Sequence, residues 1–255
     1  MRRLEGKVAL VSGTARNPGK AAALRFAAEG ALVVAGDLLH EEALETQRQI
    51  GREGGTALAP GPVDVTRPAS VEGWVAEAAE AFGGIDIVLA HAGTLRLGFL
   101  AQESHDDSPA TVDPVWLIAR AAWPHLVRSR GCVVTIGSTA GIRASLSHHR
   151  TARHDSKGGV GALTRRLAAE GSAHGIRANC VSLGPVDTEG ARADLLAEAL
   201  PPRDSVRPTS LDRLGTPQDI ARVAAFLASE EASSVSGAHL VVDGGWSAVL
   251  PDPLT

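Results

Sequence analysis

The sequence predicts a single α/β domain over residues 1–255, with a doubly wound parallel sheet of about seven strands. A length of 255 residues is near the upper end of what one domain usually holds. Short runs rich in Val, Ile and Ala alternate with longer stretches of helical period, which is the pattern of βαβ units. A glycine-rich turn follows the first of these runs, and no internal repeat or linker divides the chain.

Seven apolar runs have the length and content of buried parallel strands. They are Val8–Ser12, Ala31–Asp37, Ala57–Val65, Ile85–His91, Cys132–Ser138, Arg177–Leu183 and His239–Asp243. The stretches between them are long enough for helical crossovers. Helices are therefore expected near Lys20–Glu29, Glu41–Arg52, Ala69–Phe82, Pro114–Arg128, Ser156–Ala173 and Pro217–Leu227.

Composition and charge indicate a cytoplasmic protein that acts on a small molecule. The net charge is −4 and the charged residues are scattered, so neither a nucleic-acid surface nor a membrane patch is expected. No stretch reaches the ~20 apolar residues of a membrane span, and none resembles a signal peptide. Cys132 and Cys180 lie in apolar runs and are predicted to be buried thiols; no metal site is expected. The proline-containing segment 189–213 is a candidate lid over the substrate site.

A nucleotide site is predicted after the first strand. Gly13, Arg16, Asn17 and Gly19 belong to a turn that opens a helix, where free backbone N–H groups and the helix dipole stabilise a pyrophosphate. Asp37 ends the second predicted strand, a suitable place to accept both hydroxyls of an adenosine ribose.

Together with Asp64-Val65, Ala90-His91-Ala92-Gly93, Gly184-Pro185-Val186-Asp187-Thr188 and the run from Arg213 to Gly245, this turn resembles the short-chain dehydrogenase/reductase family over essentially the whole chain. The resemblance implies a seven-stranded Rossmann variant, a homotetramer or homodimer, and NAD or NADP at the carboxyl edge of the sheet. Asp37 would repel a 2′-phosphate and favours NAD(H). The implied coenzyme contacts also include Asp64, Val65, Gly93, Lys157 and Thr188.

The sequence departs from the family around this ligand. Asn17 and Pro18 replace the middle glycine of the turn and its follower, His91 replaces the asparagine of Asn-Ala-Gly, and Leu183 replaces a proline. Asparagine tolerates a left-handed backbone and proline fits a first helical turn, so the fold is expected to survive. The changes leave two interpretations open, a relaxed demand for NAD and a working but imperfect coenzyme site.

The family's catalytic set is half present. Ser138 and Lys157 match its serine and lysine, but Arg153 stands in the tyrosine position and Thr111 in the asparagine position. The chain contains no tyrosine anywhere. The arginine side chain keeps its proton up to at least pH ~12, so it is a poor general acid or base. The sequence therefore disfavours the family's alcohol–carbonyl chemistry.

Arg153 has two interpretations. If it and Lys157 share a helix face, two cations four residues apart favour an anion between them, and Ser138 and Arg153 would bind a carboxylate, a phosphate or an enolate. Alternatively, Arg153 faces solvent or pairs with a nearby acid. His91 and His154 are the candidates for proton transfer in place of tyrosine.

Three functions follow from these residues. The first is an enzyme that uses the cleft for non-redox chemistry, such as cyclisation, elimination, isomerisation or hydrolysis. The second is an NAD(H)-dependent oxidoreductase whose proton donor is not tyrosine. The third is a non-catalytic family member. The residues favour them in that order, with little between the first two, because fold does not fix reaction type.

Overall fold

The computed structural model describes residues 2–91, 112–143, 151–188, 210–211 and 213–248, and of residues 151–155 it describes only the backbone. Within these ranges the chain forms one seven-stranded parallel sheet in the order β3-β2-β1-β4-β5-β6-β7. The strands are β1 (Val8–Ser12), β2 (Leu32–Gly36), β3 (Thr56–Leu58), β4 (Ile87–Ala90), β5 (Cys132–Ser138), β6 (Arg177–Leu183) and β7 (His239–Val242).

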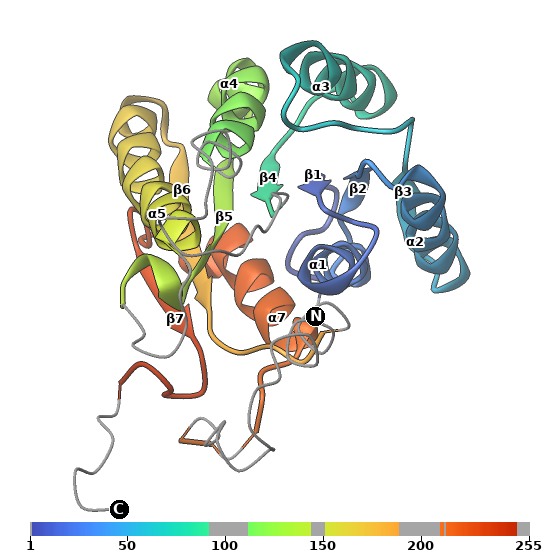
Figure 1. Ribbon diagram of the computed structural model, residues 1–255. Helices are drawn as coiled ribbons and strands as arrows, with labels where there is room; N and C mark the ends of the chain where they lie inside the picture. The colour runs from blue at the N-terminus through green and yellow to red at the C-terminus, as the bar shows by residue number, and fades with distance from the viewer. Residues whose placement is uncertain (1, 92–111, 144–150, 189–209, 212, 249–255) are drawn as a thin grey trace, which may run out of the picture.

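Helices cover both faces of this sheet (Figure 1). They are α1 (Asn17–Ala28), α2 (His40–Arg52), α3 (Pro68–Phe82), α4 (Val112–Ser129), α5 (Thr151–Gly171) and α7 (Pro217–Ala228), with short 3-10 turns η2 (Thr139–Gly141), η3 (Ser172–His174) and η4 (Glu230–Ala232). Helix α1 packs against α7 and α2 on one face, while α4 packs between α3 and α5 on the other. The predicted fold class is confirmed.

Successive side chains along a strand point to opposite faces of the sheet, so each face has a separate hydrophobic core. In β1, Ala9 and Val11 belong to the core under α1 and α7, whereas Val8 and Leu10 belong to the core under α3, α4 and α5. All four side chains are at most 5% exposed, as expected for a strand buried on both faces. Cys132 and Cys180 are buried free thiols, one in each core.

Several predicted boundaries were wrong, three of them by three residues or more: the end of the third strand, the start of the first helix, and the start of α5, which begins at Thr151 rather than Ser156. The third strand ends at Leu58 rather than Val65, because Pro60, Gly61 and Pro62 follow it and proline supplies no N–H for a parallel ladder. The first helix begins at Asn17 rather than Lys20, because Pro18 is accommodated in the first turn, where an N–H has no partner to lose.

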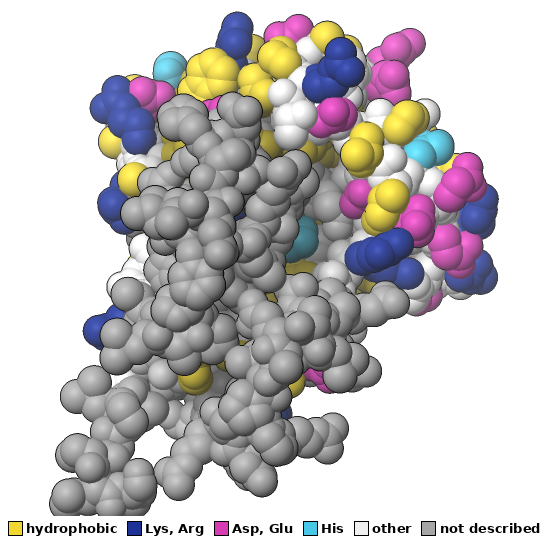
Figure 2. Space-filling view, in the orientation of Figure 1, with side chains coloured by type: hydrophobic (Ala, Val, Ile, Leu, Met, Phe, Trp, Pro, Cys, Tyr) yellow, Lys and Arg dark blue, Asp and Glu magenta, His cyan; other side chains and the backbone are white. Residues whose placement is uncertain are grey.

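The surface and the helices bear on what the protein contacts. On the face shown in Figure 2, basic and acidic side chains are interspersed over the part of the molecule that is coloured. Among the described residues, no helix is long and apolar enough to cross a membrane. The same residues include no group of three or more His, Cys, Asp or Glu placed to hold a metal ion.

Candidate functional site

The sheet order reverses at the carboxyl ends of β1 and β4. From β1 the chain proceeds to β2 and β3 on one side, and then returns to β4 and continues outward on the other side. Ligands of doubly wound sheets bind at such a reversal, outside the carboxyl ends of the strands. The predicted site residues whose side chains the structure describes lie at or after the carboxyl ends of β1 to β6, except Lys157, which lies on α5.

The glycine turn after β1 needs its small residues. Gly13 has a φ of 75°, and its N–H donates to the Gly36 carbonyl at 2.8 Å. A Cβ on Gly19 would lie 2.0 Å from the Gly13 carbonyl oxygen, so only glycine lets α1 begin this close to the turn. Asn17, which replaces a family glycine, has a φ of 51° and so adopts the left-handed backbone expected of it.

The amino end of α1 is open to an anion. Its N-cap residue, Arg16, makes no side-chain cap, and its first turn has no acidic residue. Backbone N–H groups at this end therefore lack a side-chain acceptor, although Pro18 removes one donor. The Arg16 guanidinium lies 3.3 Å from the Glu42 carboxylate on α2, and both side chains are well exposed.

Asp37 is held beside this turn. Its Oδ2 accepts a hydrogen bond from the Ala15 N–H at 2.9 Å, and its Oδ1 accepts one from the Leu39 N–H at 3.0 Å. The backbone of Asp37 pairs with Pro62 in an isolated parallel bridge. These contacts fix an acceptor group between the glycine turn and the end of β2.

Asp64 and Val65 form the corresponding turn before α3. The Asp64 Oδ1 accepts from the Thr66 N–H at 3.0 Å and from the Thr66 hydroxyl at 2.6 Å, and these bonds lower the pKa of Asp64. The Val65 side chain is buried. The bonds of Asp64 stabilise its own turn, and its coenzyme contact stays a prediction.

His91 follows β4 at the centre of the edge. Its backbone N–H donates to the Ser12 hydroxyl at 3.0 Å, which ties the end of β4 to the end of β1. Its Nδ1 is buried and has no hydrogen-bond partner among the described residues. Burial, and then the charge of Lys157, lower the pKa of His91 to about 4, so the imidazole is neutral at neutral pH.

Ser138 and Lys157 are brought together by η2. Ser138 ends β5, is 3% exposed, and its Oγ accepts from the Ala140 N–H at 3.2 Å. The Lys157 ammonium donates to the Ile136 carbonyl at 3.3 Å. A Cβ on Gly141 would lie 2.5 Å from the Lys157 carbonyl oxygen, so glycine allows η2 to pack directly on α5.

The residues that precede Lys157 lie on the same helix. Positions 153 and 154 come four and three residues before position 157 within α5, so all three are within one turn of each other. The side chains of Arg153 and His154 lie outside the described residues. Gly93, Thr111 and most of the candidate lid 189–213 also lie outside them.

Backbone hydrogen bonds hold the segment before Thr188 against Gly215. The Asp187 N–H donates to the Gly215 carbonyl at 2.9 Å, and the Gly215 N–H donates to the Pro185 carbonyl at 2.9 Å. Gly184 is in close contact with Asp243, where an added Cβ would lie 2.4 Å from the Asp243 Cβ. Thr188 is partly exposed directly after this anchored segment.

The structure reveals buried polar atoms that the sequence patterns do not single out. Three further buried side-chain atoms lack a partner among the described residues: Thr14 Oγ1, His40 Nδ1 and Trp74 Nε1. Thr14 belongs to the glycine turn, His40 opens α2, and the Trp74 ring lies against Gly36 at the end of β2. With His91, all four residues are near the carboxyl ends of β1, β2 and β4, where a polar ligand would meet them.

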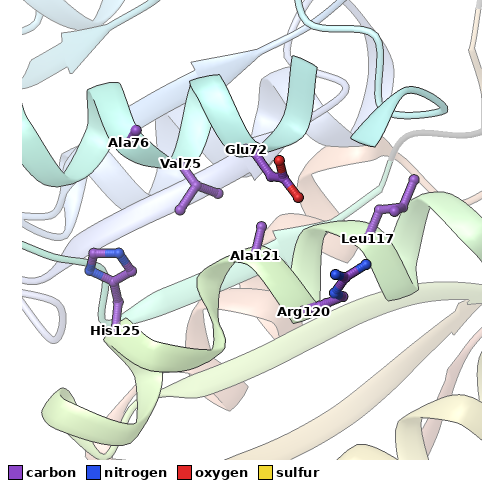
Figure 3. A pocket seen from close by; sticks show the side chains of 7 residues that line it. All are labelled: Glu72, Val75, Ala76, Leu117, Arg120, Ala121 and His125. Atoms are coloured by element: carbon purple, nitrogen blue, oxygen red, sulfur yellow. The ribbon is translucent and has the colours of Figure 1, made fainter. Parts of the chain in front are cut away.

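A separate groove lies between α3 and α4, with a cavity volume of about 320 Å³ (Figure 3). It is lined by Glu72, Val75, Ala76, Leu117, Arg120, Ala121 and His125. None of these is a predicted site residue. The groove therefore plays no part in the site at the sheet edge.

Comparison with known proteins identifies what this arrangement resembles. A family model described as enoyl-(acyl carrier protein) reductase matches residues 13–247. The chain is 37% identical to a 2,5-dichloro-2,5-cyclohexadiene-1,4-diol dehydrogenase of Sphingobium indicum, covering 96% of this chain and 98% of the relative. It is 33% identical to a meso-2,3-butanediol dehydrogenase of Serratia marcescens, covering 96% of both chains.

A solved structure agrees with these relatives. A 7α-hydroxysteroid dehydrogenase, in complex with NADH and 7-oxo glycochenodeoxycholic acid, superimposes with a TM-score of 0.88 at 29% identity. The match covers 96% of this chain and 95% of that chain.

These findings overturn the function that the sequence analysis ranked first. Non-redox chemistry was inferred from the loss of the family's tyrosine and asparagine beside a retained Ser138 and Lys157, yet the relatives named above, which match over nearly the whole chain, are dehydrogenases. The inference was wrong because it took the loss of one proton donor for the loss of hydride transfer. Hydride transfer depends on the coenzyme, and a different group can move the proton.

Proposed function

Because the chain belongs to the short-chain dehydrogenase/reductase family, we propose that it is an NAD(H)-dependent oxidoreductase that interconverts a secondary alcohol and a ketone, with a proton donor other than tyrosine. The observation that carries the proposal is the Asp37 carboxylate, held by two backbone N–H groups beside the glycine turn. NAD(H), when bound, supplies or accepts the hydride.

The donor set at the sheet edge suits NAD(H) better than NADP(H). A carboxylate accepts hydrogen bonds from two neighbouring ribose hydroxyls and repels a 2′-phosphate. Arg16, the cation of the glycine turn, is 3.3 Å from the Glu42 carboxylate and is therefore already paired with an acidic group. The open amino end of α1 suits a pyrophosphate.

Ser138 and Lys157 act on the oxygen of the reacting carbon. The Ser138 Oγ accepts from Ala140, which leaves its hydroxyl hydrogen to donate to a substrate oxygen. The Lys157 ammonium lies close enough to this edge to lower the pKa of His91, and the same charge stabilises an alkoxide that forms there.

His154 is the proton-transfer group in this proposal. It comes one turn before Lys157 on α5, next to Arg153 in the position of the family tyrosine. An ordinary histidine pKa near 6.5 suits proton exchange at neutral pH. His91 is less suited, because a group with a pKa of about 4 is a weak base and carries no spare proton at pH 7.

The relatives point to diols as substrates. Two are named for a cyclic and an acyclic diol, so cyclic and vicinal diols and their hydroxyketones are the first compounds to test. Arg153, in the tyrosine position, is assigned to an anionic or hydroxylated part of the substrate.

The test is NADH formation from NAD⁺ with 1,2-cyclohexanediol and meso-2,3-butanediol, and NADH consumption with the matching hydroxyketones. The wild-type protein is expected to turn over at least one of them. His154→Gln should lower kcat at least tenfold and flatten the pH profile of kcat around neutral pH, whereas His125→Gln, in the α3–α4 groove, should change neither. No hydride transfer with either diol or hydroxyketone would contradict the assigned substrate class, and an unchanged pH profile in His154→Gln would contradict the proton donor.

A further inference from the structure

The inference concerns His91, a residue in which this chain departs from the family pattern. His91 is fixed by its backbone, since its N–H donates to the Ser12 hydroxyl at 3.0 Å. The Ser12 hydroxyl in turn donates to the Leu89 carbonyl at 3.4 Å, so the Ser12 side chain ties the end of β1 to the end of β4. The side chain is therefore placed at the reversal point of the sheet.

The Nδ1 of this imidazole has no hydrogen-bond partner in the part of the chain that the structure describes, although it is buried. A buried polar atom without a partner costs free energy, and proteins retain such atoms where a ligand completes them. The Thr14 hydroxyl, two residues beyond Ser12 in the glycine turn, is in the same situation. The two atoms flank the ends of β1 and β4.

We propose that the Nδ1 of His91 is a coenzyme contact, which hydrogen-bonds a hydroxyl or amide of NAD(H) bound at the sheet edge. The proposal rests on the proposed function, since it needs the coenzyme to bind. A ribose hydroxyl both donates and accepts, so it matches either tautomer of a neutral imidazole.

The electrostatic surroundings keep this contact uncharged. Lys157, on α5, is the charged group whose field acts on His91, and it disfavours an imidazolium in the same way as burial does. A neutral imidazole near Lys157 adds no second positive charge at this edge of the sheet. His91 thus serves as a binding group, and proton transfer is left to another residue.

The test compares three variants by calorimetric titration with NADH and by thermal unfolding of the coenzyme-free protein. His91→Leu removes the polar atom, and should weaken NADH binding about tenfold, the effect of one lost hydrogen bond. The same variant should unfold at a higher temperature than the wild type, because an unpartnered buried nitrogen is gone. His91→Asn, which places an amide near the position of Nδ1, should bind NADH within about threefold of the wild type.

The matched control is His125→Leu. His125 is also partly buried, but its Nδ1 has a partner, the Arg128 guanidinium at 2.7 Å, and it lines the α3–α4 groove. This variant should neither weaken NADH binding nor gain thermal stability.

The outcomes separate the two proposals. If the wild type binds NADH and His91→Leu binds it equally well, the role of His91 is refuted while the proposed function stands. If the wild type does not bind NADH, the proposed function fails and the His91 contact fails with it. If His91→Leu does not fold, His91→Gln replaces it, since its amide reaches the position of Nε2 rather than Nδ1, and equal binding by the Gln and Asn variants refutes the assignment to Nδ1.

Discussion

At the scale of single residues, His91 shows what burial does to a sequence inference. From the sequence it is a candidate proton donor, because an unperturbed histidine titrates near neutral pH. In the structure it follows a buried strand and lies near Lys157, and both circumstances disfavour the charged imidazole. The residue type was a sound reason to choose it, but the direction of its pKa shift depends on contacts that the sequence does not display.

This shift predicts how stability depends on pH. The pKa of His91 is lowered from 6.5 to about 4, so above pH 6.5 the imidazole is neutral in both the folded and unfolded chain. Between pH 6.5 and pH 4 only the unfolded chain takes up the proton, and folding becomes less favourable as pH falls. At pH 5.5 the effect is on the order of 1 kcal/mol.

The measurement is urea unfolding of the wild type and His91→Leu at pH 7.5 and pH 5.5. The difference in unfolding free energy between the two proteins should change by about 1 kcal/mol in favour of the variant at the lower pH. A difference that is the same at both values would show that His91 titrates normally in the folded protein.

At the scale of elements, sequence patterns predicted the strands and helices closely. Three strands have the predicted bounds, and α2, α3 and α7 differ from their predicted bounds by one residue at one end. These elements have strong apolar patterns that tertiary contacts reinforce. The third strand was drawn too long, since apolar residues continue beyond Leu58 and the Pro60-Gly61-Pro62 segment should have ended it.

The turn between β1 and α1 gives a prediction for this scale. Gly19→Ala places a Cβ 2.0 Å from the Gly13 carbonyl oxygen, a backbone atom that cannot move without displacing the turn. The substitution should cost about 2 kcal/mol of stability or more. It should also weaken NADH binding, because the amino end of α1 moves away from the turn.

Gly73→Ala is the matched control. Gly73 lies inside α3, and a Cβ there meets nothing within 4 Å. Because alanine favours the helix, this variant should be about 0.5–1 kcal/mol more stable than the wild type. Equal unfolding midpoints in urea for the two variants would contradict the close packing at Gly19.

At the scale of the whole molecule, one buried carboxylate connects the beginning of the chain to its body. Glu29, at the end of α1, is 2% exposed and pairs with Arg25 at 2.6 Å and with Arg3, which also reaches Glu231 at 3.0 Å in η4. The Arg3 guanidinium, more than the Arg25 guanidinium, lowers the pKa of Glu29 to about 2. Residues far apart in sequence thus share one ion-pair network.

Glu29→Gln should destabilise the protein by about 3 kcal/mol, because it leaves Arg3 without its main counter-charge. The contribution of Glu29 is complete above pH 4.5 and is lost as pH falls towards 2, so the variant and the wild type should converge in acid. Glu170→Gln breaks the exposed Arg166–Glu170 pair and should cost less than about 1 kcal/mol. Equal losses in the two variants, measured by urea unfolding at pH 7, would contradict the importance of burial.

The fold and the site differ in how far the sequence predicts them. The carboxyl ends of predicted strands identify Gly13, Asp37 and Ser138 as neighbours, because a parallel sheet brings those ends to one edge. The sequence does not reveal that the Nδ1 of His91 lacks a partner, since that depends on the packing of other elements. The reaction class was misjudged from the lost tyrosine and asparagine, because those two positions weigh less than a match over nearly the whole chain to dehydrogenases.

The central claim is that the carboxyl edge of the sheet binds NAD(H), and calorimetric titration of the coenzyme-free wild type tests it most directly. NADH should bind with a dissociation constant in the micromolar range and at least tenfold more tightly than NADPH. Asp37→Ala should remove most of that preference, because its carboxylate both accepts the ribose hydroxyls and repels the 2′-phosphate. No binding of NADH up to millimolar concentrations, or tighter binding of NADPH by the wild type, would contradict the account.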